Sequence, residues 1–183
     1  MSLLGKAAVA MWWNIRPDQR SEFGDWHSHE HFPERMSIAG FRRGSRWTST
    51  LDAEGFFVLY ELQHYKTLTS KGYMDRLNAP TSWSTRMMPH HLNMIRSQCR
   101  IAASFGGGIA TSLATVRLSS ESEKQHDLKS ALIQMARRHS LEGRIDWRSP
   151  SDDRYPSDER SYDRAANPRI GRRGGLDRVD LRL

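Results

Sequence analysis

Cysteine is almost absent from this chain of 183 residues, which contains only Cys99. A single cysteine cannot form an internal disulfide, and this is typical of a reducing compartment, so we expect a cytoplasmic protein. Long apolar runs are missing as well, since none approaches the roughly 18 residues that cross a bilayer. Met1–Gly5 is too short and too weakly patterned for a secretory signal. We therefore expect no membrane partner.

Nucleic-acid-binding motifs are also missing, although the formal net charge is +7. A basic balance of this kind can indicate a nucleic-acid partner. Residues 148–183 contain nine arginines and seven acidic residues, so +2 lies in that segment and +5 in the rest of the chain. Neither part shows a zinc-finger spacing, an aromatic RNA-binding motif or a basic helix. We expect a solvated basic surface and no nucleic-acid partner.

The stretch from Trp26 to Trp47 concentrates more chemically versatile side chains than any other part of the chain. Three of the eight histidines lie within five consecutive positions of it. The residues around them repeat at helical spacing, which predicts one helix face shared by His27 and His31. Pro33 disfavours the helical conformation at the residue before it, so we expect the helix to end near His31.

These two histidines allow three interpretations. In the first, His27 and His31 are partly buried and hydrogen-bonded at a helix end. In the second, a histidine lies in a pocket as an acid, a base or a hydrogen-bond donor, and His31 is favoured. The ordinary histidine pKa near 6.5 suits proton transfer near neutrality. In the third they bind a metal, but the HExxH order is absent, and His90 and His91 could add ligands only if the fold brings them close. We expect no metal site.

The hydrophobic pattern predicts an α+β fold. The strands are expected at Lys6–Ile15, Phe41–Thr48, Phe56–Leu62 and Leu92–Phe105, and the helices from Asp18 or Ser21 to His31 and over Tyr65–Leu77. A loop is expected at residues 78–84. The resulting order β, α, β, β, α, β is that of the ferredoxin-like split βαβ unit, an antiparallel sheet with both helices on one face. We assign this unit to residues 1–106.

A partial second βα unit is expected at residues 107–147. Ile109–Leu118 is strand-like, Ser122–His139 is helical, and Gly143–Trp147 can add one more strand. The composition then changes to arginine, aspartate, serine, proline and glycine. Such a segment has too few aliphatic groups to offset the entropy lost on ordering. We expect residues 148–183 to form a disordered tail.

A single ferredoxin-like unit leaves one face of its sheet uncovered. Trp13, Phe57 and Leu59 are expected on that outer face, because side chains alternate along a strand. Monomers rarely expose so much apolar surface. We therefore expect a homodimer that is joined sheet to sheet.

The segments EHFPER, AGFRRGSRW and FFVLYEL, together with the order of elements, resemble the dimeric α+β barrel superfamily, nearest to its EthD-like members. The resemblance covers about residues 6–105 and, more faintly, 109–147. It implies a cleft between helices and sheet for a small organic molecule, often aromatic or oxygenated. Some members of the superfamily are oxygenases, lyases or isomerases, and others have no known activity. His31 matches the position of the pocket histidine, and without a phosphate-binding glycine loop or a flavin fingerprint we expect no cofactor.

Two functional hypotheses follow. The first is a small-molecule-binding protein that acts as a cofactor-independent enzyme, with His31 as the catalytic acid or base or as an orienting group. The expected substrate-binding residues are Trp26, His27, Arg46, Trp47 and Tyr60. Among them, Arg46 would neutralise an anionic group of the ligand. The second hypothesis is a non-catalytic binding or oligomeric interaction module whose paired sheets form the functional surface. Independently of this choice, the tryptophans are more often core residues, and Arg42, Arg43 and Arg46 are most simply a solvated edge.

Overall fold

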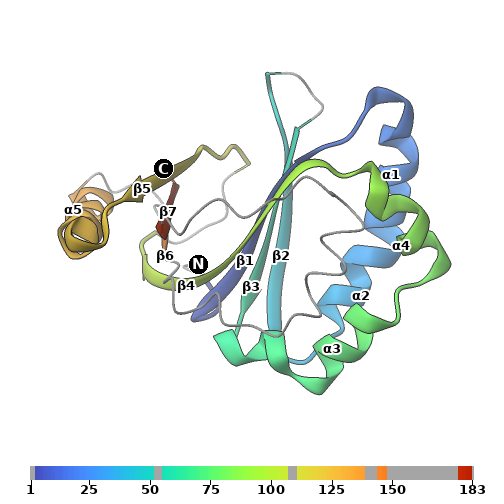
Figure 1. Cartoon of the computed structure of the whole chain (residues 1–183), viewed down its shortest axis with the longest axis horizontal. Coiled ribbons are helices and arrows are strands. Elements are labelled where there is room, and N and C mark those ends of the chain that lie inside the picture. Colours follow the sequence, from blue (N-terminus) through green and yellow to red (C-terminus); the bar gives the residue numbers. More distant parts are fainter. Residues whose placement is uncertain (1–2, 52–54, 107–110, 139–143, 148–176, 183) are drawn as a thin grey trace.

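An antiparallel sheet runs through the part of the chain that the computed structural model describes, residues 3–51, 55–106, 111–138, 144–147 and 177–182 (Figure 1). Its strands lie in the order β2-β3-β1-β4-β6-β7-β5. The strands are β1 Ala7–Asn14, β2 Phe41–Thr48, β3 Gly55–Leu62, β4 Leu92–Ser104, β5 Thr115–Ser120, β6 Arg144–Trp147 and β7 Asp177–Arg182. The α-helices are α1 Arg20–Trp26, α2 Phe32–Met36, α3 Lys71–Asn78, α4 Ser82–Met87 and α5 Gln125–Arg138. None of the helices in these ranges is both long enough and apolar enough to span a bilayer.

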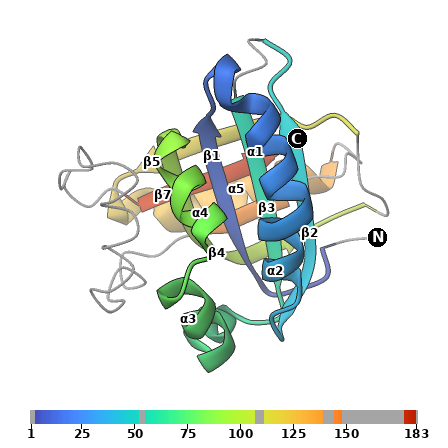
Figure 2. The same ribbon diagram turned by 90° about the vertical axis from the view of Figure 1, so that its right-hand side faces the viewer.

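The first four strands and the helices on one side of them form a ferredoxin-like unit. The order β2-β3-β1-β4, with every neighbouring pair antiparallel, is the one that the split βαβ connectivity produces. In Figure 2 the helices α1, α2 and α4 lie in front of strands β1 to β3. The predicted α+β fold and ferredoxin-like unit are confirmed.

Strand β3 is buried on both of its faces, which explains the unbroken apolar run Phe56–Tyr60. Val58 and Tyr60 face the helices and belong to the larger core cluster. Phe57 and Leu59 face the other side and belong to a second cluster. A strand with one face in water would alternate between apolar and polar residues, whereas a continuous apolar run indicates two covered faces.

Aromatic rings build the core on the helix side. Phe23 of α1 packs against Phe56 of β3 with ring centroids 4.7 Å apart and against Trp13 of β1 at 6.0 Å. Trp13 belongs to this helix-side core cluster, so its expected place on the outer face is wrong. The run AAVAMWW is apolar at every position, and it therefore contains no alternation that distinguishes the two faces of β1.

The outer face of the four-stranded sheet is covered by the second unit of the same chain. Strand β4 is 13 residues long, and its first part pairs with β1 while its last part pairs with β6. Figure 1 shows β5, β6, β7 and α5 on the side of the sheet opposite to α1–α4. Trp12, on the outer face, donates a hydrogen bond from Nε1 to Thr115 Oγ1 of β5 over 3.0 Å. The two units are thus in direct contact.

This arrangement changes the surface that a partner could use. Phe57 and Leu59 were expected at a sheet-to-sheet dimer interface, but they are only 7% and 3% exposed within one chain. The expected interface is therefore corrected, because the chain itself already covers these side chains. The homodimer stays a prediction, and its interface must lie on another surface.

The helix that contains the histidines does not end at His31. Helix α1 leads into a π-helical turn, His27–His31, and this turn leads directly into α2. Pro33 lies in the first turn of α2. In a regular α-helix its ring would clash with the carbonyl four residues earlier. The π turn is wider, since the N–H of Phe32 reaches the carbonyl of His27 five residues back, and this widening accommodates the proline.

Polar caps set the starts of α3 and α4. The hydroxyls of Ser70 and Thr81 each accept a hydrogen bond from the backbone N–H three residues further on. The cap at Ser70 divides the expected helix Tyr65–Leu77 into a short 3-10 turn and α3. The segment 78–84, expected to be a loop, instead contains the start of α4.

Two expectations about the second unit differ from the structure. Strand β5 begins at Thr115, later than the expected Ile109, and residues 109–110 lie outside the described ranges. Asp177–Arg182, within the expected disordered tail, is strand β7 and lies between β6 and β5. This part of the tail prediction is wrong, because β7 finds backbone partners on both sides. The rest of the tail, 148–176 and 183, lies outside the described residues.

A buried ion pair lies on the outer face of the first unit. Arg43 Nε is 2.6 Å from Glu61 Oε1, and Glu61 is 1% exposed. The other carboxylate oxygen of Glu61 accepts a hydrogen bond from the N–H of Leu4 at 2.7 Å. Arg43 is therefore not part of the solvated arginine edge that was expected, whereas Arg42 is exposed.

Candidate functional site

A cavity of about 700 Å³, its open mouth included, lies between the helices and the inner face of the sheet. Strands β1 to β4 contribute side chains to it from the sheet, and the α1–α2 helix, α3 and the 3-10 turn Met88–His90 contribute side chains from the helix layer. Aromatic, methionine and aliphatic side chains make up most of the lining, and its histidines and arginines are His27, His31, His91, Arg35 and Arg96.

One face of the α1–α2 helix supplies three of these side chains. His27, His31 and Arg35 follow one another at intervals of four residues. In a regular α-helix, four residues turn about 40° past a full circle, so successive side chains drift around the axis. The wider π-helical turn at His27–His31 opposes this drift. All three side chains consequently reach the same cavity.

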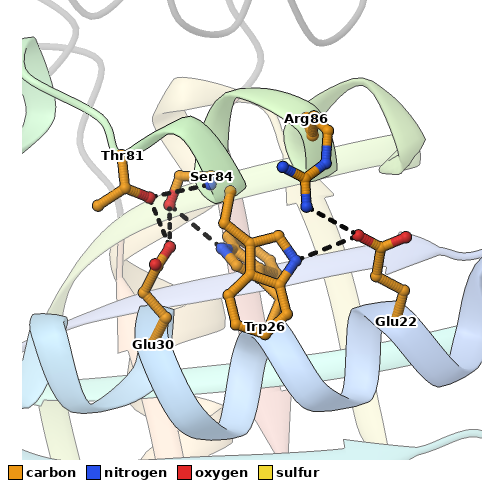
Figure 3. Close-up of polar contacts among 7 residues, drawn as sticks. Glu22, Trp26, Glu30, Thr81, Ser84 and Arg86 are labelled. Atoms are coloured by element: carbon orange, nitrogen blue, oxygen red, sulfur yellow. Dashed lines mark hydrogen bonds and ion pairs between the residues drawn. The ribbon is translucent and has the colours of Figure 1, made fainter.

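Trp26 supports His31 from behind. The two rings stack with centroids 4.5 Å apart and an interplanar angle of 29°. The indole Nε1 of Trp26 donates a hydrogen bond to Ser84 Oγ at 3.2 Å, and Ser84 in turn donates to Glu30 Oε1 at 3.3 Å (Figure 3). Thr81 also donates to the carboxylate of Glu30. This network fixes the indole between α1 and α4.

Glu22 joins the same two helices at a second point. Its Oε1 accepts hydrogen bonds from Trp83 Nε1 and from Arg86 Nη2, each at 3.2 Å (Figure 3). These contacts are solvent-exposed, so they add less stability than the buried Trp26 network. Together the two sets of contacts hold α4 against α1.

The three cavity histidines are neutral near pH 7. Burial, followed by the charge of Arg46 and the proximity of His91, lowers the pKa of His27 to about 3. Burial lowers the pKa of His91 to about 4, against two backbone hydrogen bonds that favour its charged form. For His31, burial and then the charge of Arg35 lower the pKa well below its ordinary value of 6.5. Each ring therefore provides one N–H donor and one acceptor nitrogen.

His91 has a defined tautomer. Its Nδ1 lies 3.1 Å from the carbonyl oxygen of Met88 and 3.3 Å from that of Met87. Carbonyl oxygens only accept hydrogen bonds, so Nδ1 carries the proton and Nε2 is the acceptor nitrogen. His90 and His91 were both possible metal ligands from the sequence, and only His91 is among the residues that line the cavity.

Five buried side-chain atoms around the cavity lack a hydrogen-bond partner in the described part of the chain. They are Trp13 Nε1, His27 Nδ1, His31 Nδ1, Arg35 Nη1 and Tyr60 Oη, and all five residues line the cavity. Buried polar atoms nearly always have a partner, so such a cluster needs an explanation. Outside the cavity, Ser120 Oγ is the one further such atom among the described residues. The cavity lining is therefore rich in polar groups that a bound molecule could satisfy.

Positive charge dominates the cavity lining. Arg35 is 7% exposed, and its guanidinium lies 5.7 Å from the centre of the Tyr73 ring. Arg96 donates from Nη2 to Tyr73 Oη at 2.7 Å. Of the residues described, no aspartate or glutamate lines the cavity. Burial raises the pKa of Tyr60 above its ordinary value, so its phenol stays protonated and can donate a hydrogen bond.

Four of the predicted site residues lie in or beside the cavity. His27, His31 and Tyr60 line it. Trp26 lies directly behind His31 and is fully buried. Arg46 is outside the lining, but it is near enough that its charge lowers the pKa of His27.

Trp47 lies on the opposite face of the sheet. Its ring centroid is 5.7 Å from that of Phe57, in the outer cluster. Neighbouring residues of a strand point to opposite faces, so Arg46 and Trp47 cannot both face the helices. The expectation that Trp47 lines the pocket is therefore corrected.

Arg35, His91 and Arg96 line the cavity without having been expected there as ligand-binding groups. Arg35 was missed because Pro33 was taken as the end of the helix, although its spacing of four from His31 could have identified it. His91 was considered only as a metal ligand. Arg96 lies in a strand whose pattern contains no clear alternation, so its inward position had no signal in the sequence.

The metal interpretation of the histidines requires a third ligand close to both rings. The ring centroids of His27 and His31 are 5.7 Å apart. Among the residues that the structure describes, no group of three His, Cys, Asp or Glu side chains is placed to hold one ion. Within these ranges the two histidines are instead part of a cavity wall.

Comparison with known proteins identifies the fold. No family model and no curated protein matches the sequence. The solved structure of an anthrone oxidase-like protein matches 100% of this chain and 95% of its own, with a TM-score of 0.60 and 8% identity. A candidate monooxygenase from Fusobacterium nucleatum matches 98% of this chain and 93% of its own, with a TM-score of 0.53 and 7% identity. A dimeric ferredoxin-like protein from an uncultured marine organism matches 56% of this chain and 92% of its own, with a TM-score of 0.45 and 8% identity.

The chain shares its fold with the anthrone oxidase-like protein and the candidate monooxygenase. The first two matches extend over nearly the whole chain, so the ferredoxin-like unit followed by a second unit is an arrangement that other proteins share. At these identities the likeness concerns the fold alone. The finer likeness to EthD-like members stays a prediction.

Proposed function

We propose that the protein binds a small organic molecule in the cavity beneath α1 and α2 and acts on it as a cofactor-independent enzyme. The proposed reaction types are those of an oxygenase, a lyase or an isomerase, with His31 as the acid, the base or the orienting group. The observation that supports this most is the cluster of five unpartnered polar atoms around one cavity. Two proteins of similar fold are described as an anthrone oxidase-like protein and a candidate monooxygenase, which agrees with oxygen-dependent chemistry.

In the proposed reaction His31 removes a proton from an acidic C–H or O–H group of the ligand. A neutral imidazole has an acceptor nitrogen for that proton. Its lowered pKa makes it a weak base, so the transfer needs an anion to form beside a compensating charge. Arg35 lies close enough to depress the pKa of His31, and the same charge would stabilise that anion. The protonated phenol of Tyr60 is a further donor to a developing oxyanion.

A substitution of His31 separates binding from chemistry. His31→Gln keeps a polar side chain of similar size but cannot transfer the proton. Calorimetric titration with 2-naphthol and oxygen uptake with anthrone should show binding that is nearly unchanged and turnover that falls by at least about 100-fold. His126→Gln, on the exposed side of α5, is the matched control. Equal turnover in the wild type and in His31→Gln would remove His31 from the mechanism.

A non-catalytic binding or oligomeric interaction module is the second candidate. The observation in its favour is the low pKa of the cavity histidines, because an imidazole with a pKa of about 3 is a poor base at neutrality. Under this alternative the wild type binds the aromatic probe but consumes no oxygen and converts no enolisable ligand. The turnover assay with wild-type protein therefore distinguishes the two candidates.

We also propose a homodimer located in the cytoplasm. The single cysteine supports the location. The dimer is carried over from the sequence hypothesis, and its interface would avoid Phe57 and Leu59 because these are covered within the chain. Sedimentation equilibrium at micromolar concentration tests the assembly directly.

A further inference from the structure

We propose that the ligand of this cavity is an organic anion, an aromatic carboxylate whose acidic group pairs with Arg35. The inference rests on the proposed function, since it assumes that the cavity is the ligand site, and it adds the chemical class of that ligand. Neither the sequence hypothesis, which gave this role to Arg46, nor the likeness of folds assigns a role to Arg35.

Arg35 is a buried cation whose guanidinium is incompletely paired. It lies on α2, lines the cavity, and is 7% exposed. Its Nη1 has no hydrogen-bond partner, and no carboxylate of the described residues forms an ion pair with it. A buried charge without a counter-charge is strongly unfavourable. An anion bound in the cavity would remove this penalty.

Arg43 provides the comparison within the same chain. It too is largely covered, and the fold supplies it with the buried carboxylate of Glu61 at 2.6 Å. None of the residues that the structure describes supplies an equivalent carboxylate to Arg35, although both guanidinium groups must leave water. The difference is explained if the carboxylate that pairs with Arg35 belongs to a ligand. A planar guanidinium matches a carboxylate with two parallel hydrogen bonds.

The surroundings of Arg35 also suit an acid. Arg96 adds a second positive charge to the lining, and no described acidic residue lines the cavity. Two further polar atoms that lack partners, His31 Nδ1 and Tyr60 Oη, belong to residues on which the charge of Arg35 acts. A carboxylate has about four acceptor sites, so it can satisfy these groups together with the guanidinium.

The remainder of the lining suits an aromatic body. Trp13 and Met11 of β1, Phe41 at the start of β2 and Met88 before β4 are among the lining side chains. Aromatic and thioether groups pack favourably against a flat ring. The acidic group would then lie at Arg35 and the ring against these side chains, with the neighbouring carbon or oxygen atoms facing His31.

The test compares 2-naphthoate with its neutral amide, 2-naphthamide, by calorimetric titration. The variants are Arg35→Met, which removes the charge but keeps the apolar length, Arg35→Lys, and the exposed control Arg42→Met. Wild-type protein should bind 2-naphthoate at least about 30-fold more tightly than 2-naphthamide. Arg35→Met should lose that preference, Arg35→Lys should keep part of it, and Arg42→Met should keep all of it.

The free protein offers a second measurement. Arg35→Met should melt at the same temperature as the wild type or higher, because an unpaired buried charge is replaced by an apolar group. It should also lose the increase in melting temperature that 2-naphthoate gives the wild type. If Arg35→Met does not fold, the comparison of the two probes on wild-type protein still tests whether the cavity prefers an anion.

Equal affinity of wild-type protein for the acid and the amide would overturn this inference and leave the proposed function intact. An unchanged preference for the acid in Arg35→Met would also overturn it, because another cation would then hold the anion. Absence of binding by both probes would overturn the proposed function, and this inference with it.

Discussion

The imidazole of His31 is stacked on the indole of Trp26, with ring centroids 4.5 Å apart, and the N–H of this indole is held by Ser84 of α4. The orientation of the candidate catalytic ring therefore depends on a hydroxyl in another helix. Trp26 and Ser84 are both buried, so water cannot replace the hydrogen bond if it is lost.

Ser84→Ala tests this dependence. The substitution leaves the indole N–H of Trp26 buried without a partner, and we expect the free energy of unfolding to fall by about 1–3 kcal/mol. Turnover should fall as well, whereas affinity for an aromatic probe should change little. Urea denaturation and steady-state kinetics measure the two effects. Ser82→Ala, at an exposed position of the same helix, should change neither, and a fully stable Ser84→Ala protein would show that the contact is dispensable.

The buried histidines predict a specific dependence of stability on pH. Their pKa values are lowered to about 3 for His27 and about 4 for His91, while unfolded histidines titrate near 6.5. Below about pH 6.5 the unfolded chain therefore binds more protons than the folded chain, and stability falls as the pH falls. Each histidine adds a slope that approaches about 1.4 kcal/mol per pH unit.

Urea denaturation at several values between about pH 5 and pH 7 measures this slope, above the range where carboxylates titrate. His91→Gln should reduce the slope of the free energy of unfolding against pH by the contribution of one histidine. His126→Gln, in which an exposed ring is replaced, should leave it unchanged. A wild-type stability that is flat over this range would contradict the burial of neutral histidines.

The Arg43–Glu61 ion pair predicts a large loss of stability when one partner is removed. Arg43→Ala leaves the buried carboxylate of Glu61 without its counter-charge, and we expect a loss on the order of 3 kcal/mol. Thermal or urea denaturation provides the measurement. Arg42→Ala, next to it but exposed, should cost less than about 0.5 kcal/mol. Similar losses for the two variants would contradict the buried pair.

The covered outer face predicts the behaviour of Leu59. Leu59→Asp places a charge in the contact between the first sheet and the second unit, so we expect the chain to unfold, not merely a dimer to dissociate. Circular dichroism and analytical ultracentrifugation distinguish the two outcomes. Leu51→Asp, at a residue that is 95% exposed, is the control. A folded monomer of Leu59→Asp would place this face at an interface between two chains.

The strands could be predicted because their apolar runs are long and uninterrupted. Phe56–Leu62 was expected within one residue of the observed β3, and Phe41–Thr48 coincides with β2. Which face a residue takes could not be predicted where every position is apolar, and Trp13 was misplaced for that reason. Trp47 was misplaced because its alternation with Arg46 was not applied.

The candidate site could be predicted only in part. The spacing of His27 and His31 indicated a shared face, and both histidines reach the cavity. Pro33 concealed the continuation of the helix, because the π turn that accommodates it has no clear signature in the sequence. Arg35 and its role therefore emerged only from the fold. The cover of the outer face depends on contacts between residues about 100 positions apart, such as Trp12 and Thr115, which local patterns do not reveal.

The central claim is that a small organic molecule binds among the three cavity histidines His27, His31 and His91, and nitrogen NMR of histidine side chains tests it most directly. Protein labelled with 15N-histidine should show neutral His27, His31 and His91 at neutral pH, assigned through single His→Gln variants. On titration with 2-naphthol the signals of these three rings should shift together and saturate, while those of the exposed His29, His64 and His126 stay in place. Shifts confined to the exposed histidines, or no shift at saturating probe, would contradict the account.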